Sequence, residues 1–131
     1  KVIGAIFEKM ETAHSKRNPA NESALDAEFH LAIIEASHNV IMLHMMRSMF
    51  DLLREGVFYN RKIMFKQRTT RDMLLDQHRA INNALQERDS GGARAAVVAH
   101  LDFVQQSLTN QQRSDKNEEI ARMRFQHEKE R

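Results

Sequence analysis

The sequence predicts an all-α protein folded as an antiparallel helical bundle. Helix breakers are scarce, since the 131 residues include four glycines and one proline, and both types are unfavourable inside helices. Apolar residues recur at intervals of three and four, which is the spacing of one helix face. No segment alternates as a strand does, and short turns between helices favour antiparallel neighbours.

The first two helices are expected near the amino terminus. The first spans about residues 2–14. Its apolar face consists of Ile3, Ile6, Phe7 and Met10. Pro19 should end this segment, because proline cannot donate the backbone hydrogen bond that continues a helix. A second helix is expected over residues 22–37, beginning at the Ser23-x-x-Asp26 pattern that is typical of helix starts.

The central part of the chain predicts one long helix over residues 40–66. The preceding His38-Asn39 should end the second helix, since asparagine tolerates the left-handed conformation found there. Gly56 lies inside the long helix and marks the expected position of a kink. Methionines are frequent, and we interpret them as filler of the core. The apolar face of this helix includes Ile41, Met45, Met49 and Leu52.

Two further helices and a tail complete the prediction. The fourth helix is expected over residues 70–88 and the fifth over residues 93–108, with a turn at Asp89-Ser90-Gly91-Gly92 that also caps the fifth helix. The remaining residues carry charges of both signs and few apolar side chains. We therefore expect residues 1–112 to form the bundle and residues 113–131 a charged, loosely docked helical tail.

Composition narrows the classes of function. The chain has no cysteine, so histidine, aspartate or glutamate must bind any metal ion, and a reducing, cytoplasmic location is expected. The sequence contains no run of 18 apolar residues, so it predicts no membrane-spanning helix. The formal net charge is +2. Basic residues gather between Arg54 and Arg79, but without a stripe or motif that reads DNA, and we interpret them as a solvated helix face.

Three histidines and one aspartate stand out as candidates for chemistry. His78 lies between Leu74 and Ile81 on one apolar face, and His100 lies similarly between Val97 and Val104. Asp26 and His30 are four residues apart, so they share a face of the second helix. Burying an unpaired carboxylate is costly.

A single histidine on an apolar face is best interpreted as a hydrogen-bonded core residue. Three such histidines on three helices, together with a carboxylate, favour a bound cation instead. Their nitrogen and oxygen donors suit a divalent metal such as Zn²⁺, Ni²⁺ or Mn²⁺. Four protein ligands would leave two positions of an octahedral ion for water or for an incoming carboxylate.

The segment from Asp26-Ala-Glu-Phe-His30 to Ser37-His-Asn39 resembles the signature of the FCD ligand-binding domain. This domain occurs in FadR-subfamily regulators of the GntR superfamily. Gln77-His78-Arg79-Ala80-Ile81 and Ala99-His100-Leu101 extend the resemblance, with the 22-residue spacing usual for the last two histidines of the family. The resemblance implies a metal site inside the bundle, with Asp26, His30, His78 and His100 as its ligands.

The resemblance also implies a small carboxylate as the effector and a homodimeric transcription regulator as the whole protein. Residues 35–44 are similar to members that respond to pyruvate, lactate or glycolate. Pyruvate-responsive members can lack the full metal set, whereas this chain keeps all four ligands, which favours a 2-hydroxy acid over a 2-keto acid. Arg47, on the long helix, is the candidate for binding the carboxylate of the effector; its alternative is a surface arginine.

The chain departs from the family pattern at its amino terminus. Members carry a winged helix-turn-helix and then a first sensor helix with an R-x-x-x-E-like motif, and neither is present in this sequence. Only 25 residues precede Asp26. The resemblance therefore implies an N-terminally truncated sensor domain, with DNA bound only through the missing domain.

Two alternatives remain open from the residues. One is a di-iron enzyme, because Glu11-x-x-His14 and Glu35-x-x-His38 both match the Glu-x-x-His motif of such bundles. Glu55 and Glu87 would have to supply its other carboxylates. Other enzyme motifs are missing, including H-E-x-x-H and G-x-S-x-G, and we predict no enzyme. The second alternative is a structural dimerisation bundle with buried polar histidines.

Overall fold

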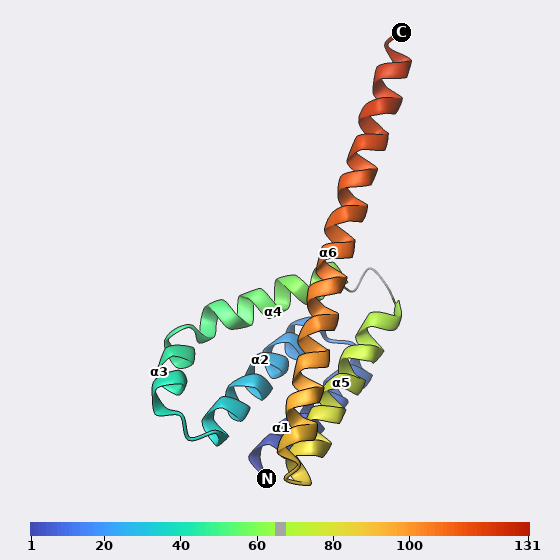
Figure 1. Cartoon of the computed structure of the whole chain (residues 1–131). Helices are drawn as coiled ribbons and strands as arrows, with labels where there is room; N and C mark the ends of the chain where they lie inside the picture. The colour runs from blue at the N-terminus through green and yellow to red at the C-terminus, as the bar shows by residue number, and fades with distance from the viewer. Residues whose placement is uncertain (65–67) are drawn as a thin grey trace.

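A computed structural model describes residues 1–64 and 68–131 of the chain. Within these ranges the protein forms helices and no strand, which confirms the all-α prediction (Figure 1). The helices are α1 (Val2–Lys16), α2 (Pro19–Ala36), α3 (Val40–Ser48), α4 (Phe50–Met64), α5 (Arg68–Gln86) and α6 (Ser90–Lys129). None of these helices combines the length and apolar character needed to cross a membrane.

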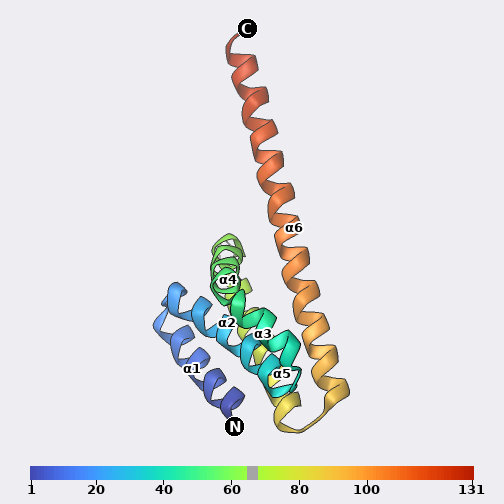
Figure 2. The same ribbon diagram turned by 90° about the vertical axis from the view of Figure 1, so that its left-hand side faces the viewer.

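The bundle is built around α2 and α5. Helix α1 packs against both of them, and α5 packs against the first part of α6 (Figures 1 and 2). Helix α4 crosses α2 and also contacts α6, while α3 joins α2 to α4. The second part of α6 extends well beyond the other helices.

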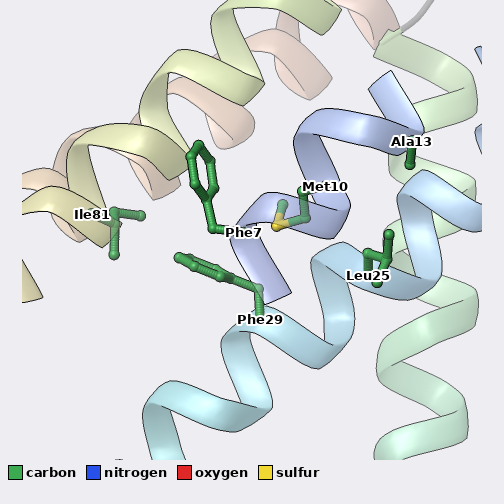
Figure 3. Packing of buried hydrophobic residues seen from close by; sticks show 6 residues of the cluster. All are labelled: Phe7, Met10, Ala13, Leu25, Phe29 and Ile81. Atoms are coloured by element: carbon green, nitrogen blue, oxygen red, sulfur yellow. The ribbon is translucent and has the colours of Figure 1, made fainter. Parts of the chain in front are cut away.

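The apolar core lies where α1, α2 and α5 meet. Its six buried members are Phe7, Met10, Ala13, Leu25, Phe29 and Ile81 (Figure 3). The rings of Phe7 and Phe29 lie with their centroids 6.4 Å apart, within the range of favourable aromatic contacts. The apolar face predicted for the first helix is therefore confirmed at Phe7 and Met10.

Helix α2 begins three residues earlier than its sequence pattern suggested. The side chain of Asn18 accepts a hydrogen bond from the backbone N–H of Asn21 at 3.3 Å, and Pro19 occupies the first turn, where its missing N–H costs nothing. The expected start at Ser23 is wrong, because the hydroxyl of Ser23 instead donates to the carbonyl of Pro19 inside the helix, at 2.9 Å.

The predicted long central helix is divided in two. Helix α3 ends at Ser48 and α4 begins at Phe50, whereas Gly56 lies inside α4, so the break falls at Met49 and not at the expected glycine. This change of direction carries the chain from α3 back across α2 toward α6. The predicted end at Lys66 lies outside the described residues.

The apolar face expected for the long central helix is another departure from the prediction. Ile41, Met45, Met49 and Leu52 are all exposed in the structure. Most methionines of this region are therefore not core filler, although Met46 is half-buried. Periodicity predicted helical structure here but did not reveal that these four apolar side chains would have no cover within the described chain.

The fifth helix and the tail form one continuous helix of 40 residues, α6. At 1.5 Å per residue, such a helix is about 60 Å long. The predicted cap is confirmed, since the carboxylate of Asp89 accepts a hydrogen bond from the N–H of Gly92 at 2.9 Å. The backbone stays helical across the predicted domain boundary at residue 112, and the division into bundle and tail remains a prediction.

Candidate metal centre

Three helices bring the three predicted histidines to one place inside the bundle. His30 comes from α2, His78 from α5 and His100 from α6, and each offers a ring nitrogen within 4.8 Å of the other two. His78 is fully buried and His100 nearly so, whereas the side chain of His30 keeps 22% of its exposure. The cluster is therefore enclosed on most sides, with His30 nearest to solvent.

Asp26 lies beside this cluster, one helical turn before His30. Its Oδ1 atom is 3.0 Å from Nε2 of His30 and 3.1 Å from Nε2 of His78. The same two nitrogens are 3.4 Å from each other. Asp26 thus contacts two of the three clustered histidines, His30 and His78, although these residues are up to 52 positions apart in the sequence.

The imidazole rings pack against one another and against the core. The rings of His30 and His100 are stacked with centroids 5.5 Å apart, and those of His78 and His100 are 4.5 Å apart. Phe29 presents its ring to both His30 and His78 in edge-on contacts. This packing restricts the side-chain rotamers, so the donor atoms are held in place by the fold.

The Nδ1 atoms of the two most buried histidines, His100 and His78, differ in their hydrogen bonding. The Nδ1–H of His100 donates to Oε1 of Gln77 at 2.7 Å, which fixes the tautomer and leaves Nε2 available to a cation. Nδ1 of His78 has no hydrogen-bond partner among the described residues. The other ring nitrogen of His78, Nε2, is the one that faces Asp26 and His30.

The local electrostatics favour a neutral His100 near an ionised Asp26. Burial, followed by the neighbouring His78 and His30, lowers the pKa of His100 to about 3. For Asp26, burial by itself raises the pKa. The electrostatic interaction with His78, the hydrogen bonds from His30 and His78, and the charge of Arg61 together hold the pKa of Asp26 well below its ordinary value. Neutral imidazole and ionised carboxylate are the forms that bind metal ions.

A second buried group, absent from the sequence prediction, adjoins the candidate metal centre. Nε of Arg61 donates to Oδ2 of Asp26 at 2.8 Å, and Nη1 of Arg61 donates to Glu22 at 3.3 Å. Arg71 donates to both carboxylate oxygens of Glu22. Arg61 is only 6% exposed, so the interpretation of this basic segment as a solvated face is wrong for Arg61 and incomplete for Arg71, which is half-buried.

The remaining candidate residues lie elsewhere. Arg47 is half-exposed on α3, and its guanidinium is 3.4 Å from the carboxylate of Glu35. The two Glu-x-x-His motifs do not converge. His14 pairs with Asp72 at 2.9 Å, and Glu11 pairs with Arg79. Over the two described ranges, the histidine cluster is the only group of this kind placed to hold a metal ion, and the geometry gives the di-iron alternative no support.

The donor set fits a divalent cation. Three nitrogens and one carboxylate oxygen, with no thiolate, suit Zn²⁺, Ni²⁺ or Mn²⁺. The partner of His100 Nδ1 and the ionised Asp26 both agree with such a role.

Comparison with known proteins adds an independent observation. The sequence profile of the family described as "FCD domain" matches residues 1–103. The putative L-lactate dehydrogenase operon regulatory protein of Escherichia coli K12 is 41% identical over 91 residues, covering 70% of this chain and 35% of that protein. The regulator LutR of Bacillus subtilis is 36% identical over 64% of the chain and 39% of its own length.

A third relative has a related name. The Glc operon transcriptional activator of Escherichia coli K12 is 30% identical over 110 residues, covering 82% of this chain and 43% of that protein. The chain therefore spans less than half the length of these three relatives.

Proposed function

The chain belongs to the FCD domain family, and on that basis we propose that it senses a small carboxylate for a bacterial transcription regulator. The proposed effector is a 2-hydroxy or 2-keto acid of the glycolate, lactate or pyruvate type, held together with one divalent metal ion. The observation that carries the proposal is the buried cluster of His30, His78 and His100 beside Asp26. The names of the relatives, which refer to regulation of lactate and Glc operons, support the class of effector.

Each of the four residues has a defined part in this proposal. His30, His78 and His100 would hold the metal through nitrogen, and Asp26 through its Oδ1 oxygen. Gln77 keeps the ring of His100 in the required tautomer through the 2.7 Å hydrogen bond. A bound divalent ion would supply a concentrated positive charge, and its attraction for a carboxylate is strong where water is largely excluded.

The proposal extends to the whole regulator. Residues 1–112 are assigned to the sensing bundle and residues 113–131 to a charged extension. DNA would be bound by a separate winged helix-turn-helix domain, the protein would act as a homodimer in the cytoplasm, and the sensing domain would have no enzymatic activity. A role for Arg47 in binding the effector carboxylate remains a prediction, because its observed partner is Glu35.

Metal binding is the first test. Purified protein should bind one Zn²⁺, Ni²⁺ or Mn²⁺ per chain, measured by elemental analysis and calorimetry. The His78→Ala or His100→Ala variant should lose affinity by more than the roughly 10–100-fold typical of changes to outer-shell partners. His44→Ala is the matched control, since His44 is exposed on α3. Retention of full affinity by both cluster variants would contradict the assignment.

Effector binding is the second test. Calorimetry with metal-loaded protein should detect binding of glycolate or L-lactate, and removal of the metal by a chelator should abolish it. The reason is that the open coordination positions, and not a preformed arginine site, are proposed to hold the carboxylate. Equal affinity with and without metal would contradict this mechanism, even if the metal itself binds as expected.

A further inference from the structure

Arg61 lies where the candidate metal centre meets a second buried cluster of charges. We propose that Arg61 is a positioning residue for the metal centre: it holds the carboxylate of Asp26 so that one oxygen faces the histidines. Through this contact it also ties α4 to the centre. The inference rests on the proposed metal-binding function and assigns a role to a residue that the function does not otherwise use.

The two oxygens of Asp26 are divided between two tasks. Oδ1 faces Nε2 of His30 and of His78, at 3.0 and 3.1 Å. Oδ2 accepts the hydrogen bond from Nε of Arg61 at 2.8 Å. A carboxylate held in this way cannot rotate freely about its terminal torsion, so it offers Oδ1 alone to the histidine side.

Arg61 is also held in place by the buried carboxylate of Glu22. Its Nη1 donates to Glu22, which lies one turn before Asp26 on α2. Glu22 is only 4% exposed and also accepts hydrogen bonds from Arg71 of α5. Arg71 donates in turn to the backbone carbonyl of His14, near the end of α1. The guanidinium of Arg61 is thus held by Glu22 as well as by Asp26.

Burial makes this arrangement more than a surface ion pair. Asp26, Glu22 and Arg61 are each at most 6% exposed, and buried charges are tolerated only when they are paired and hydrogen-bonded. The network balances two carboxylates with two guanidinium groups. Arg61 is on α4 and donates a hydrogen bond to the carboxylate of Asp26. A displacement of Asp26 must therefore also displace Arg61 and the part of α4 that carries it.

The metal centre should therefore depend on Arg61, although Arg61 is not a ligand. Groups that orient metal ligands typically contribute about 10–100-fold to metal affinity. Replacement by methionine keeps most of the aliphatic stem but removes the hydrogen bonds to Asp26 and Glu22. Replacement by lysine keeps the charge but loses the planar geometry with which arginine binds two carboxylates at once.

Co²⁺ is a suitable probe, because its visible absorption reports the geometry of its ligands. We expect Arg61→Met to lower Co²⁺ affinity by about 10–100-fold and Arg61→Lys to recover part of that loss with an altered spectrum. Arg54→Met is the matched control: it also removes a guanidinium from α4, but Arg54 pairs with the exposed Asp51 and lies outside this network. It should leave the affinity and the spectrum close to those of the unmodified protein.

The outcomes separate the two proposals. Failure of the unmodified protein to bind Co²⁺, Zn²⁺, Ni²⁺ or Mn²⁺ would overturn the proposed function itself. Normal affinity and spectrum in the Arg61 variants, with binding intact in the unmodified protein, would overturn only the role of Arg61. Equal losses in the Arg61 and Arg54 variants would also overturn it, because they would show that the loss does not depend on the contact with Asp26. If Arg61→Met does not fold, the spectrum and affinity of Arg61→Lys decide the question.

Discussion

Helices α1 and α3 both carry an apolar face, yet they stand in opposite environments. In α1, Phe7 and Met10 are 5% and 3% exposed because α2 and α5 cover them. In α3, Ile41 and Met45 are 75% and 59% exposed, although α3 contacts α2 and α4. An amphipathic helix buries its apolar face only where the topology supplies a partner. Adjacent exposed apolar side chains of this kind are common at interaction sites.

A substitution in the core around α1 should have the largest effect on stability. Phe29→Ala removes a fully buried ring and should lower the free energy of unfolding by about 3–5 kcal/mol, measured by urea denaturation. Phe125→Ala is the control, since Phe125 is 59% exposed on the projecting part of α6 and its loss should change stability by less than about 0.5 kcal/mol. Similar effects of the two substitutions would remove the distinction between core and surface.

The start of α6 should show an intermediate effect. Asp89→Ala removes the side-chain acceptor for the N–H of Gly92 and should lower the free energy of unfolding by about 1 kcal/mol. Asp102→Ala, an exposed position on the same helix, tests whether loss of any carboxylate has this effect. A larger loss in Asp102→Ala than in Asp89→Ala would contradict the assignment of Asp89 as the cap.

The exposed face of α3 should be the least sensitive region if it stays uncovered in solution. Ile41→Ala should then change the free energy of unfolding by less than about 0.5 kcal/mol, at any protein concentration. Under the homodimer proposal, in contrast, a second copy could cover this face, and stability would rise with protein concentration. Denaturation at two concentrations, with sedimentation analysis of the same samples, separates these outcomes.

The sequence was informative wherever a local pattern determined the structure. The spacing of apolar residues predicted all-helical structure, and Asp89 was recognised as a cap because its partner lies three residues away. The candidate metal centre could also be predicted from the sequence, since each histidine occupied a position on an apolar helix face where leucine would be expected. The resemblance to the FCD family then joined these separate positions into one site.

Arg61 shows what local patterns do not contain. In the sequence it is one of several basic residues, and 35 positions separate it from Asp26. A buried arginine and a solvated arginine have the same sequence signal, because only the packing of α4 across α2 decides which carboxylates lie within reach. Without that packing, nothing distinguishes Arg61 from its exposed neighbour Lys62.

The sequence by itself therefore determined that the chain is helical, which face of each helix is apolar, and which residues could act as donors in the candidate metal centre. These features depend on residue type and on contacts within a few helical turns. Tertiary structure decided which apolar faces are covered, that the central helix breaks at Met49, and that α6 continues past the bundle. It also decided the pairing of Arg61 with Asp26. These features depend on contacts between distant segments, and periodicity along one helix carries no information about its neighbour.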